Sequence, residues 1–440
     1  MLDLQNPVPR AVRTCAVVLA FPMLMTACGG GGDSGDPAAP PAPPPPPVAR
    51  TLTNFQEATF VLGQPTLGAG DPDQGRPVSA QSLDGPFAMA LTPEGNLFVA
   101  DSNNNRVLLF PAPTGNGQGA KAVLGQLEFE TEGGGLSRGR MRSPLGVAVG
   151  SGKFAVADTH NNRVLIYNQV PGEGAGAEPT AVIGQIDFDS ADPSCAANRL
   201  FQPSSVAITP NGRLVVADAF NHRVLVWHQI PVPAAGALVE PDVVLGQGLR
   251  NNCVPNDDDF DGFEDIEFDG PVMTSIATAR TLKRPQGVWA DDRRLVVSDG
   301  ENNRVLIWNY SDEDPLADFQ PADLVLGHAD FNNTRVNNGQ DLPSANTLNA
   351  PNGIHSDGVG LAVADFGNGR VLVWKTFPQF SAQGADVVIG QPTFDQFFNG
   401  DTTPPATSSN TFSPVGVLLT PDELFVSDIG YHRVLVFRKH

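Results

Sequence analysis

The sequence has few basic residues for its length, and it lacks the short motifs of several common catalytic sites. Its 27 Lys and Arg residues face 48 Asp and Glu residues, which leaves a formal net charge of −21. This balance argues against nucleic acid as a partner, because phosphate binding depends on basic side chains, and against adhesion to anionic lipids. No phosphate-binding loop occurs, and the one G-x-S-x-G pattern, at 135–139, lies within the long loop 127–143 and not at a strand-to-helix turn, so it is no nucleophile elbow. The 7 histidines show no metal-ligand spacing, which argues against a catalytic zinc.

The N-terminal apolar segment is too short to span a bilayer and has the features of a secretory signal. Residues 14–27 follow Arg10 and Arg13 and end in Leu-Met-Thr-Ala before Cys28 and a glycine run. This ending resembles a bacterial lipobox, with Met25 where leucine is commoner. The resemblance implies that Cys28 becomes the lipidated first residue of the mature protein. The alternative is an ordinary cleaved signal peptide without a lipid.

The segment after Cys28 predicts a spacer between a membrane anchor and a folded domain. Residues 40–47 are nearly all proline, a composition that favours extended polyproline II and cannot form a core. We therefore expect a lipoprotein signal peptide at 1–27, a lipidated, Gly/Pro-rich linker at 28–54 and a folded domain at 55–440. Multiple acyl chains would hold the protein firmly at the bacterial cell envelope. The expected location is the outer membrane or cell surface, with the periplasmic side as an alternative.

The chain has only 4 cysteines, and two of them lie in or beside the predicted signal. Cys15 is inside the apolar segment, and Cys28 is the predicted lipid site. The remaining two, Cys195 and Cys253, form an even pair in an oxidising compartment. We expect a disulfide between them, which would join two consecutive long loops. The alternative is two independent thiols, since spacing alone does not give their distance.

One phrase of sequence, A/S-D-x-x-x-x-R-V-L, occurs six times along the chain. Its Asp and Arg residues are Asp101 and Arg106, Asp158 and Arg163, Asp218 and Arg223, Asp299 and Arg304, Asp365 and Arg370, and Asp428 and Arg433. Repetition with a period of tens of residues indicates an array of similar structural units. We expect a structural role, in which each Asp accepts turn N–H groups and pairs with its Arg. The alternative is a ring of charges that binds a ligand.

Each repeat contains four short segments typical of β-strands. The first follows a proline, the second ends at the Asp, the third starts at the Arg, and the fourth reads V-[LI]-G-[QH]. The third segment is apolar at successive positions, as in strands buried on both faces. The chain opens with a fourth strand at 60–64 and closes with a third strand at 433–437. We therefore predict an all-β, six-bladed β-propeller of four-stranded blades, in which the N-terminal strand closes the last blade.

The repeated phrase resembles a known family of propeller repeats. P-x-G-V-A followed by L-x-V-A-D-x-x-N-N-R-V-L-V-F is similar to the NHL repeat, and the likeness extends over most of residues 55–440. Local departures are Ser298 and Ser427 before the Asp, and Gly369 and Tyr431 in the Asn pattern. The V-L-G-Q ending with a long following loop resembles secreted bacterial members of the family.

Six long loops follow the fourth strands, and we expect them on one face of the propeller. They are residues 65–85, 127–143, 186–202, 248–284, 329–350 and 392–413. The loop 248–284 is the longest, with an acidic insertion at about 249–284. It contains D-x-D-x-D-G-x-x-D at Asp257, Asp259, Asp261 and Asp265, which resembles the calcium loops of thrombospondin type 3 repeats. Alternate carboxylates around a glycine turn suit calcium. The alternative is a solvated acidic loop without an ion.

These features favour a binding protein over an enzyme. Loops on a rigid scaffold usually carry binding sites, so we expect a non-catalytic scaffold that binds a protein or an extracellular polymer through the long-loop face. We expect a monomer that meets the membrane only through its lipid, with calcium as the candidate cofactor and no organic cofactor. The alternative is a surface lyase or hydrolase that acts on a small molecule or glycan in the central pocket. Trp289 and His355, on the first strands, are the pocket candidates, and no residue is assigned as catalytic.

Overall fold

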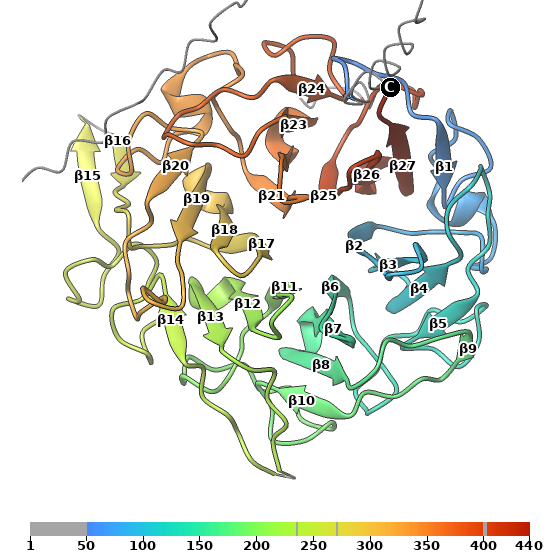
Figure 1. The fold of residues 1–440 in the computed structure, drawn as a ribbon, viewed down its shortest axis with the longest axis horizontal. Helices are drawn as coiled ribbons and strands as arrows, with labels where there is room; N and C mark the ends of the chain where they lie inside the picture. The colour runs from blue at the N-terminus through green and yellow to red at the C-terminus, as the bar shows by residue number, and fades with distance from the viewer. Residues whose placement is uncertain (1–50, 235, 270–271, 399–402) are drawn as a thin grey trace, which may run out of the picture. The chain divides into compact units, whose positions relative to one another are not determined.

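The folded part of the chain is a ring of six β-sheets, as predicted (Figure 1). A computed structural model describes residues 51–234, 236–269, 272–398 and 403–440. The predicted signal peptide, Cys28 and nearly all of the linker lie outside these residues. We number the sheets as blades 1 to 6 in chain order from Pro86. Blade 1 starts with strand β2, and blade 6 combines β25, β26 and β27 with β1.

Six inner strands surround the centre of the ring. They are β2 (Pro86–Leu91), β6 (Pro144–Gly150), β11 (Pro203–Ile208), β17 (Pro285–Ala290), β21 (Pro351–His355) and β25 (Pro414–Leu419). Each begins with a proline, a residue that is tolerated at the first position of a strand because it has no N–H to donate. The proline faces the repeated Asp of the second strand, as Pro203 faces Asp218.

The second and third strands form the buried middle of each blade. The second strands are β3 (Leu97–Asp101), β7 (Lys153–Asp158), β12 (Leu214–Asp218), β18 (Arg294–Asp299), β22 (Leu361–Asp365) and β26 (Glu423–Asp428). The third strands are β4 (Arg106–Phe110), β8 (Arg163–Tyr167), β13 (Arg223–Trp227), β19 (Arg304–Asn309), β23 (Arg370–Trp374) and β27 (Arg433–Arg438). The apolar run that starts at each Arg is buried, because neighbouring blades cover both faces of the sheet.

The outer strands are short, and the first of them closes the ring. They are β1 (Phe60–Leu62), β5 (Ala122–Leu124), β10 (Ala181–Ile183), β14 (Val243–Leu245), β20 (Leu324–Leu326) and β24 (Val387–Ile389). Strand β1 pairs with β27 in an antiparallel register, with Phe60 opposite Val436 and Leu62 opposite Val434. The predicted closure by the N-terminal strand is therefore confirmed. It gives the last blade its outer strand and covers an edge that would otherwise be unpaired.

Short 3-10 turns link the second and third strands of blades 2 to 6. They are η2 (Thr159–Asn161), η3 (Ala219–Asn221), η4 (Gly300–Asn302), η6 (Phe366–Asn368) and η7 (Ile429–Tyr431). The next residue is left-handed in every blade, for example Asn162 with φ of 51° and His222 with φ of 53°. Asn and Gly adopt this conformation most easily, which accounts for the Asn-rich hairpin sequence. The turns η1 (Pro72–Gly75) and η5 (Val336–Gly339) lie in long loops.

Three further strands lie outside the regular blade pattern. Strand β9 (Gly174–Ala175) runs parallel to β5 and adds a fifth strand to blade 1. Strands β15 (Ile266–Asp269) and β16 (Val272–Ser275) form a separate antiparallel pair within the loop 248–284. Figure 1 shows this pair, in yellow, at the outer edge of the ring.

The hydrophobic core consists of six clusters, each between two neighbouring blades. Between blades 1 and 2, for example, Phe98 stacks on Phe154 with ring centroids 4.2 Å apart. Burial of apolar area in this way is the main force that holds the blades side by side. Within the described ranges, no helix is long and apolar enough to cross a membrane.

Candidate functional site

Six buried Asp–Arg pairs lie where the second strands turn into the third strands. In blades 1 to 5 the Arg Nε donates to Asp Oδ2 at 2.7–2.8 Å, and all these side chains are fully buried. Each Asp also accepts the backbone N–H of a residue just before its own inner strand, as Asp218 does from Phe201 at 2.7 Å. Burial raises the pKa of Asp218 above its ordinary value, and the Arg223 guanidinium acts in the opposite direction. An external ligand does not reach these charges.

The remaining N–H groups of each Arg hold the two long loops that flank its blade. Arg223 Nη1 donates to the carbonyl of Arg250 in the following loop, at 2.7 Å. Its Nη2 donates to the carbonyls of Ala196 and Arg199 in the preceding loop, both at 2.9 Å. Charged donors make strong hydrogen bonds to carbonyls in a dry interior. The repeated Arg therefore fixes the bases of the loops on one face of the propeller.

The sixth pair has a different geometry. Arg433 Nη2 lies 3.5 Å from Asp428 Oδ2, and Arg433 Nε is buried without a hydrogen-bond partner. Asp428 instead accepts backbone N–H groups from Phe412 and Ser413. Tyr431 replaces the Asn that donates to the Asp carboxylate in the other five blades. The Asp–Arg pair of blade 6, the blade that β1 completes, is therefore weaker than the pairs of the other five blades.

The left-handed hairpin residue links each of five blades to the next one. Its side chain accepts the N–H of the residue before the next inner strand, as Asn162 does from Gln202 at 2.8 Å. Asn105 and Asn303 make the same bond to Ser143 and Ala350. At the two other positions a histidine replaces the Asn. His222 accepts from Arg284, and His432 accepts from Gly85 across the ring closure. Gly369 has no side chain to do so.

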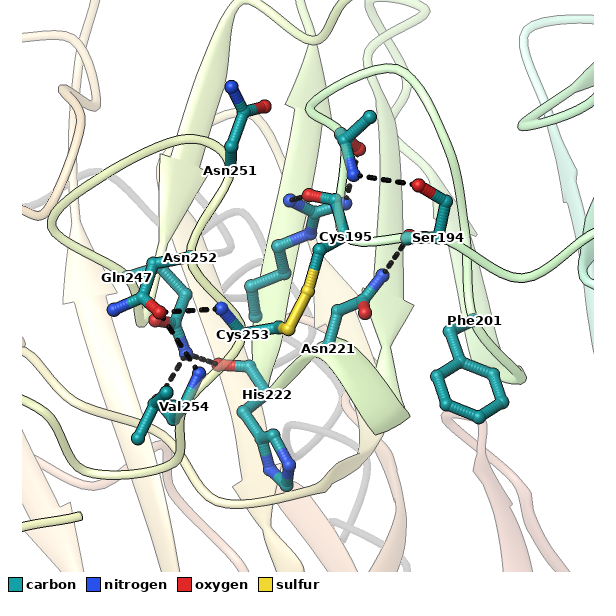
Figure 2. Close-up of a disulfide and its surroundings, with 12 residues drawn as sticks. Ser194, Cys195, Phe201, Asn221, His222, Gln247, Asn251, Asn252, Cys253 and Val254 are labelled. Carbon is teal, nitrogen blue, oxygen red and sulfur yellow. Dashed lines mark hydrogen bonds between the residues drawn. A yellow bond between two sulfur atoms is a disulfide. The ribbon is translucent and has the colours of Figure 1, made fainter. Parts of the chain in front are cut away.

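A disulfide joins two consecutive long loops, as predicted (Figure 2). Cys195 and Cys253 are bonded, with their Cα atoms 5.8 Å apart. The carbonyl of Cys195 also accepts a hydrogen bond from Arg223 Nη1 at 3.0 Å. The loop 186–202 and the start of the loop 248–284 are therefore held together covalently and through one buried Arg. Figure 2 also shows the side chain of Asn221 directed at Ser194, the residue before Cys195. Asn221 Nδ2 donates to the carbonyl of Ser194.

The inserted segment begins after Asn256, and Asn256 itself is attached to blade 4. Asn256 and Asn302 exchange side-chain hydrogen bonds of 2.8 and 2.9 Å, and Asn302 also donates to the repeated Asp299. In blade 5, Asn337 and Asn368 form the equivalent pair. The chain returns where Ile276 N–H donates to the carbonyl of Asp265 at 2.8 Å.

Three of the four predicted calcium ligands lie together in this insertion. Asp257, Asp259 and Asp261 each offer a carboxylate oxygen, and these atoms lie within 4.8 Å of one another. Gly262, with φ of 86°, provides the turn, and its N–H donates to Asp257 Oδ2 at 3.3 Å. Asp265 Oδ2 accepts the N–H of Asp258 at 3.0 Å instead. Burial, reinforced by the neighbouring carboxylates, raises the pKa of Asp265.

The β15–β16 pair that follows presents exposed apolar side chains. Phe268 lies opposite Met273 in the register, and Ile266 shares the face of Phe268 because side chains alternate along a strand. Phe268 is 70% exposed, Met273 63% and Ile266 41%, and Phe263 just before the strand is 74% exposed. Sequence reasoning missed this feature. Its signal was the alternation Ile-Glu-Phe-Asp at residues 266–269, which is weak because it is only four residues long.

Comparison with known proteins supports the repeat at the level of sequence. Two segments, residues 141–167 and 202–227, match the family model of the NHL repeat. They contain the first three strands of blades 2 and 3. The chain contains NHL repeats and folds as a six-bladed β-propeller. Propellers of this type are typically protein-interaction modules.

Among solved structures, the NHL-repeat propeller is similar to a hydrazine synthase from Kuenenia stuttgartiensis. The identity is 15%, the TM-score is 0.41, and the match covers 83% of this chain and 98% of that chain. A structure of U3-55K matches at 13% identity with a TM-score of 0.40, over 83% of this chain and 78% of that chain. No curated protein sequence matches the chain.

The central pocket of the NHL propeller is a cavity of about 240 Å³ lined by the inner strands, and Trp289 and His355 both border it. His355 Nδ1 accepts the N–H of Leu419 on the next blade at 3.2 Å, and burial lowers the pKa of His355 to about 4. Ser204 Oγ donates to the carbonyl of Pro285 on the next blade at 2.9 Å. His355 Nδ1 and the hydroxyl proton of Ser204 are therefore used in contacts between neighbouring blades.

Proposed function

We propose that the protein is a lipid-anchored component of the bacterial cell envelope that binds a partner protein. The partner docks on the long-loop face, and the β15–β16 pair is its main contact. The lipid on Cys28 and the proline-rich spacer hold the propeller at a distance from the membrane. The observation that supports this function is the exposed apolar face of β15–β16, because this surface has no counterpart among the other described long loops.

The exposure of this face is unusual for a structural reason. A two-stranded sheet is marginally stable in water, and its apolar side chains normally need a covering layer. Phe263, Phe268 and Met273 are each more than 60% exposed, although the insertion is attached to blade 4 through Asn256. Contiguous exposed apolar side chains on a folded protein mark sites of interaction. Docking of a partner would bury them.

The charge around this face indicates the chemistry of the partner. Residues 257–269 contain eight acidic residues, and the stretch from 251 to 279 contains no Lys or Arg. Complementary charge guides association and fixes the orientation of partners, while apolar contacts supply most of the affinity. We therefore expect a protein surface with an apolar centre and basic side chains around it.

The central pocket is less suited to be the functional site. Its polar side chains, such as Ser204 and His355, are bonded to the neighbouring inner strand. His355 Nδ1 is occupied as an acceptor, and a pKa of about 4 leaves the ring uncharged at neutral pH. A general base needs a free acceptor atom within reach of a substrate proton. Nothing in this arrangement favours the lyase or hydrolase alternative.

Affinity purification of the full-length protein after reversible cross-linking in cells tests the binding role. The variant Phe268→Ser with Met273→Ser removes the apolar face without touching the blades. We expect it to lose a protein that the unchanged chain retains, and to bind that purified protein at least tenfold more weakly, a loss of about 1.4 kcal/mol.

Phe380→Ser is the matched control, because Phe380 is 61% exposed in the connection between β23 and β24, on the opposite face. The control should retain the partner with unchanged affinity. Equal binding by the hairpin variant and the unchanged chain would show that the partner uses another surface. Recovery of a polysaccharide in place of a protein would favour the extracellular polymer.

The anchor has its own test, which is independent of the partner. Cys28→Ser should abolish metabolic labelling with a palmitate analogue and should release the protein from the membrane fraction. Cys15→Ser is the control, because Cys15 lies within the predicted signal peptide and should leave labelling unchanged. Labelling that persists in Cys28→Ser would refute the lipid attachment.

A further inference from the structure

The acidic loop at the start of the insertion places negative charge where no positive charge balances it. Asp257, Asp259 and Asp261 hold carboxylate oxygens within 4.8 Å of one another. Among the described residues, none of the three forms a salt bridge. Lys283, a basic residue of the same long loop, is paired with Glu264 at 2.6 Å. Like charges at this separation repel unless a cation lies between them.

A second observation concerns Asp257 itself, which is not a surface residue. Its side chain is only 1% exposed. Oδ2 accepts hydrogen bonds from Asn252 Nδ2 at 2.8 Å and from Gly262 N–H, but Oδ1 is buried with no hydrogen-bond partner. A buried carboxylate oxygen without a partner destabilises the folded state, and more so when it is charged. The same carboxylate belongs to the group of three, so a cation there would satisfy the buried oxygen.

We propose that Asp257, Asp259 and Asp261 bind one calcium ion. Calcium takes six to eight oxygen ligands in flexible geometry, and carboxylates, backbone carbonyls and water are its usual donors. The loop supplies three carboxylates. No heavy atom lies within 4 Å of the place where a Cβ of Gly262 would be, which leaves room for carbonyl and water ligands. Magnesium requires a near-ideal octahedron and loses its water reluctantly, so it should bind more weakly.

The position of the site gives the ion a structural consequence. Asp265 connects the acidic loop to β15: its N–H donates to the carbonyl of Asn256 at 3.1 Å, and its carbonyl accepts from Ile276. The loop that binds the ion is therefore closed at the base of the β15–β16 pair. Calcium would fix the loop and reduce the opening of the whole insertion. This consequence does not depend on any partner protein.

Calorimetric titration of the purified full-length protein with calcium chloride, after treatment with a chelator, tests the site directly. We expect one calcium ion per chain with a dissociation constant of roughly 0.1–1 mM, the range of extracellular calcium modules. Magnesium should bind at least tenfold more weakly. Calcium should also slow proteolytic cleavage within residues 257–275, because a fixed loop opens less often.

Two variants and one control distinguish this site from nonspecific binding of calcium to acidic side chains. Asp261→Asn alters an exposed ligand and should fold normally, and Asp257→Asn alters the buried one. Each should weaken calcium binding at least tenfold. Asp187→Asn changes an exposed carboxylate in the long loop 186–202 and should leave binding unchanged. Absence of saturable binding, or an equal loss in Asp187→Asn, would overturn the proposal without affecting the proposed partner.

Discussion

His222 Nδ1 accepts a hydrogen bond from the backbone N–H of Arg284, 3.0 Å away, and this bond joins blade 3 to blade 4. The equivalent bond in blades 1, 2 and 4 is accepted by an Asn side chain, for example Asn162. An amide oxygen accepts at every pH, whereas Nδ1 accepts only while the imidazole is neutral. Protonation of His222 therefore breaks the bond between blades 3 and 4, whereas the bonds accepted by Asn in blades 1, 2 and 4 do not depend on pH.

Stability should fall in mild acid, in part through His222. Burial lowers its pKa from 6.5 to about 4, and the nearby Glu301 opposes this shift. Below pH 6.5 the unfolded chain takes up a proton that the folded chain refuses, so this stability is present above 6.5 and is lost as the pH falls to about 4. We expect His222→Asn to keep the bond and to reduce the loss between pH 7 and 4.5 by about 1–3 kcal/mol.

Urea denaturation of both proteins at several pH values measures this difference. His355, whose pKa burial also lowers to about 4, titrates in both proteins, so its contribution cancels in the comparison. Identical pH profiles for the unchanged chain and His222→Asn would show that His222 does not carry the effect.

The buried Arg residues should contribute far more to stability than exposed ones. Arg223→Met removes the partner of Asp218 and the bonds to two long loops, and leaves a buried carboxylate uncompensated. The expected cost is about 3–5 kcal/mol of unfolding free energy. Arg138→Met is the control, because Arg138 is 49% exposed beside Glu178 and its pair should contribute less than about 1 kcal/mol. Guanidinium denaturation checks both values, and equal costs would contradict the structural role of the repeat.

The disulfide should stabilise the two loop segments that it joins more than the ring. Cys195→Ser with Cys253→Ser removes a cross-link between residues 58 positions apart, with an expected cost of about 2–4 kcal/mol. Hydrogen exchange should rise mainly in 186–202 and 248–256, because the blades keep their own buried pairs. Uniformly faster exchange in all six blades would show that the bond supports the whole ring.

Much of this structure is readable from the sequence because the repeat is strict. The five-residue spacing from Asp218 to Arg223 recurs in every blade, and it places the pair across one hairpin in the same register each time. The disulfide followed from an even pair of cysteines in a chain predicted to be exported. The ring closure followed from the fourth-strand sequence at 60–64, far from its partner β27.

Other features depend on contacts that no local pattern reveals. The bond from Arg284 to His222 joins residues 62 positions apart, and its donor is a backbone N–H that any residue supplies. The looser pair at Asp428 depends on the turn around Tyr431. The apolar face of β15–β16 lies in an acidic segment for which the sequence suggests a calcium loop or a solvated loop, and no hairpin. The pairing that sets Phe268 opposite Met273 defines the two short strands, and this pairing is known only from the structure.

Site-specific photo-cross-linking in living cells tests the central claim most directly. A benzophenone amino acid replaces Phe268 in one strain and Phe380 in another, so that the probe samples the hairpin and the opposite face. The account predicts a discrete cross-linked protein adduct from position 268 that position 380 does not give. No adduct from position 268, or the same adducts from both positions, would contradict the claim that this hairpin binds a partner protein.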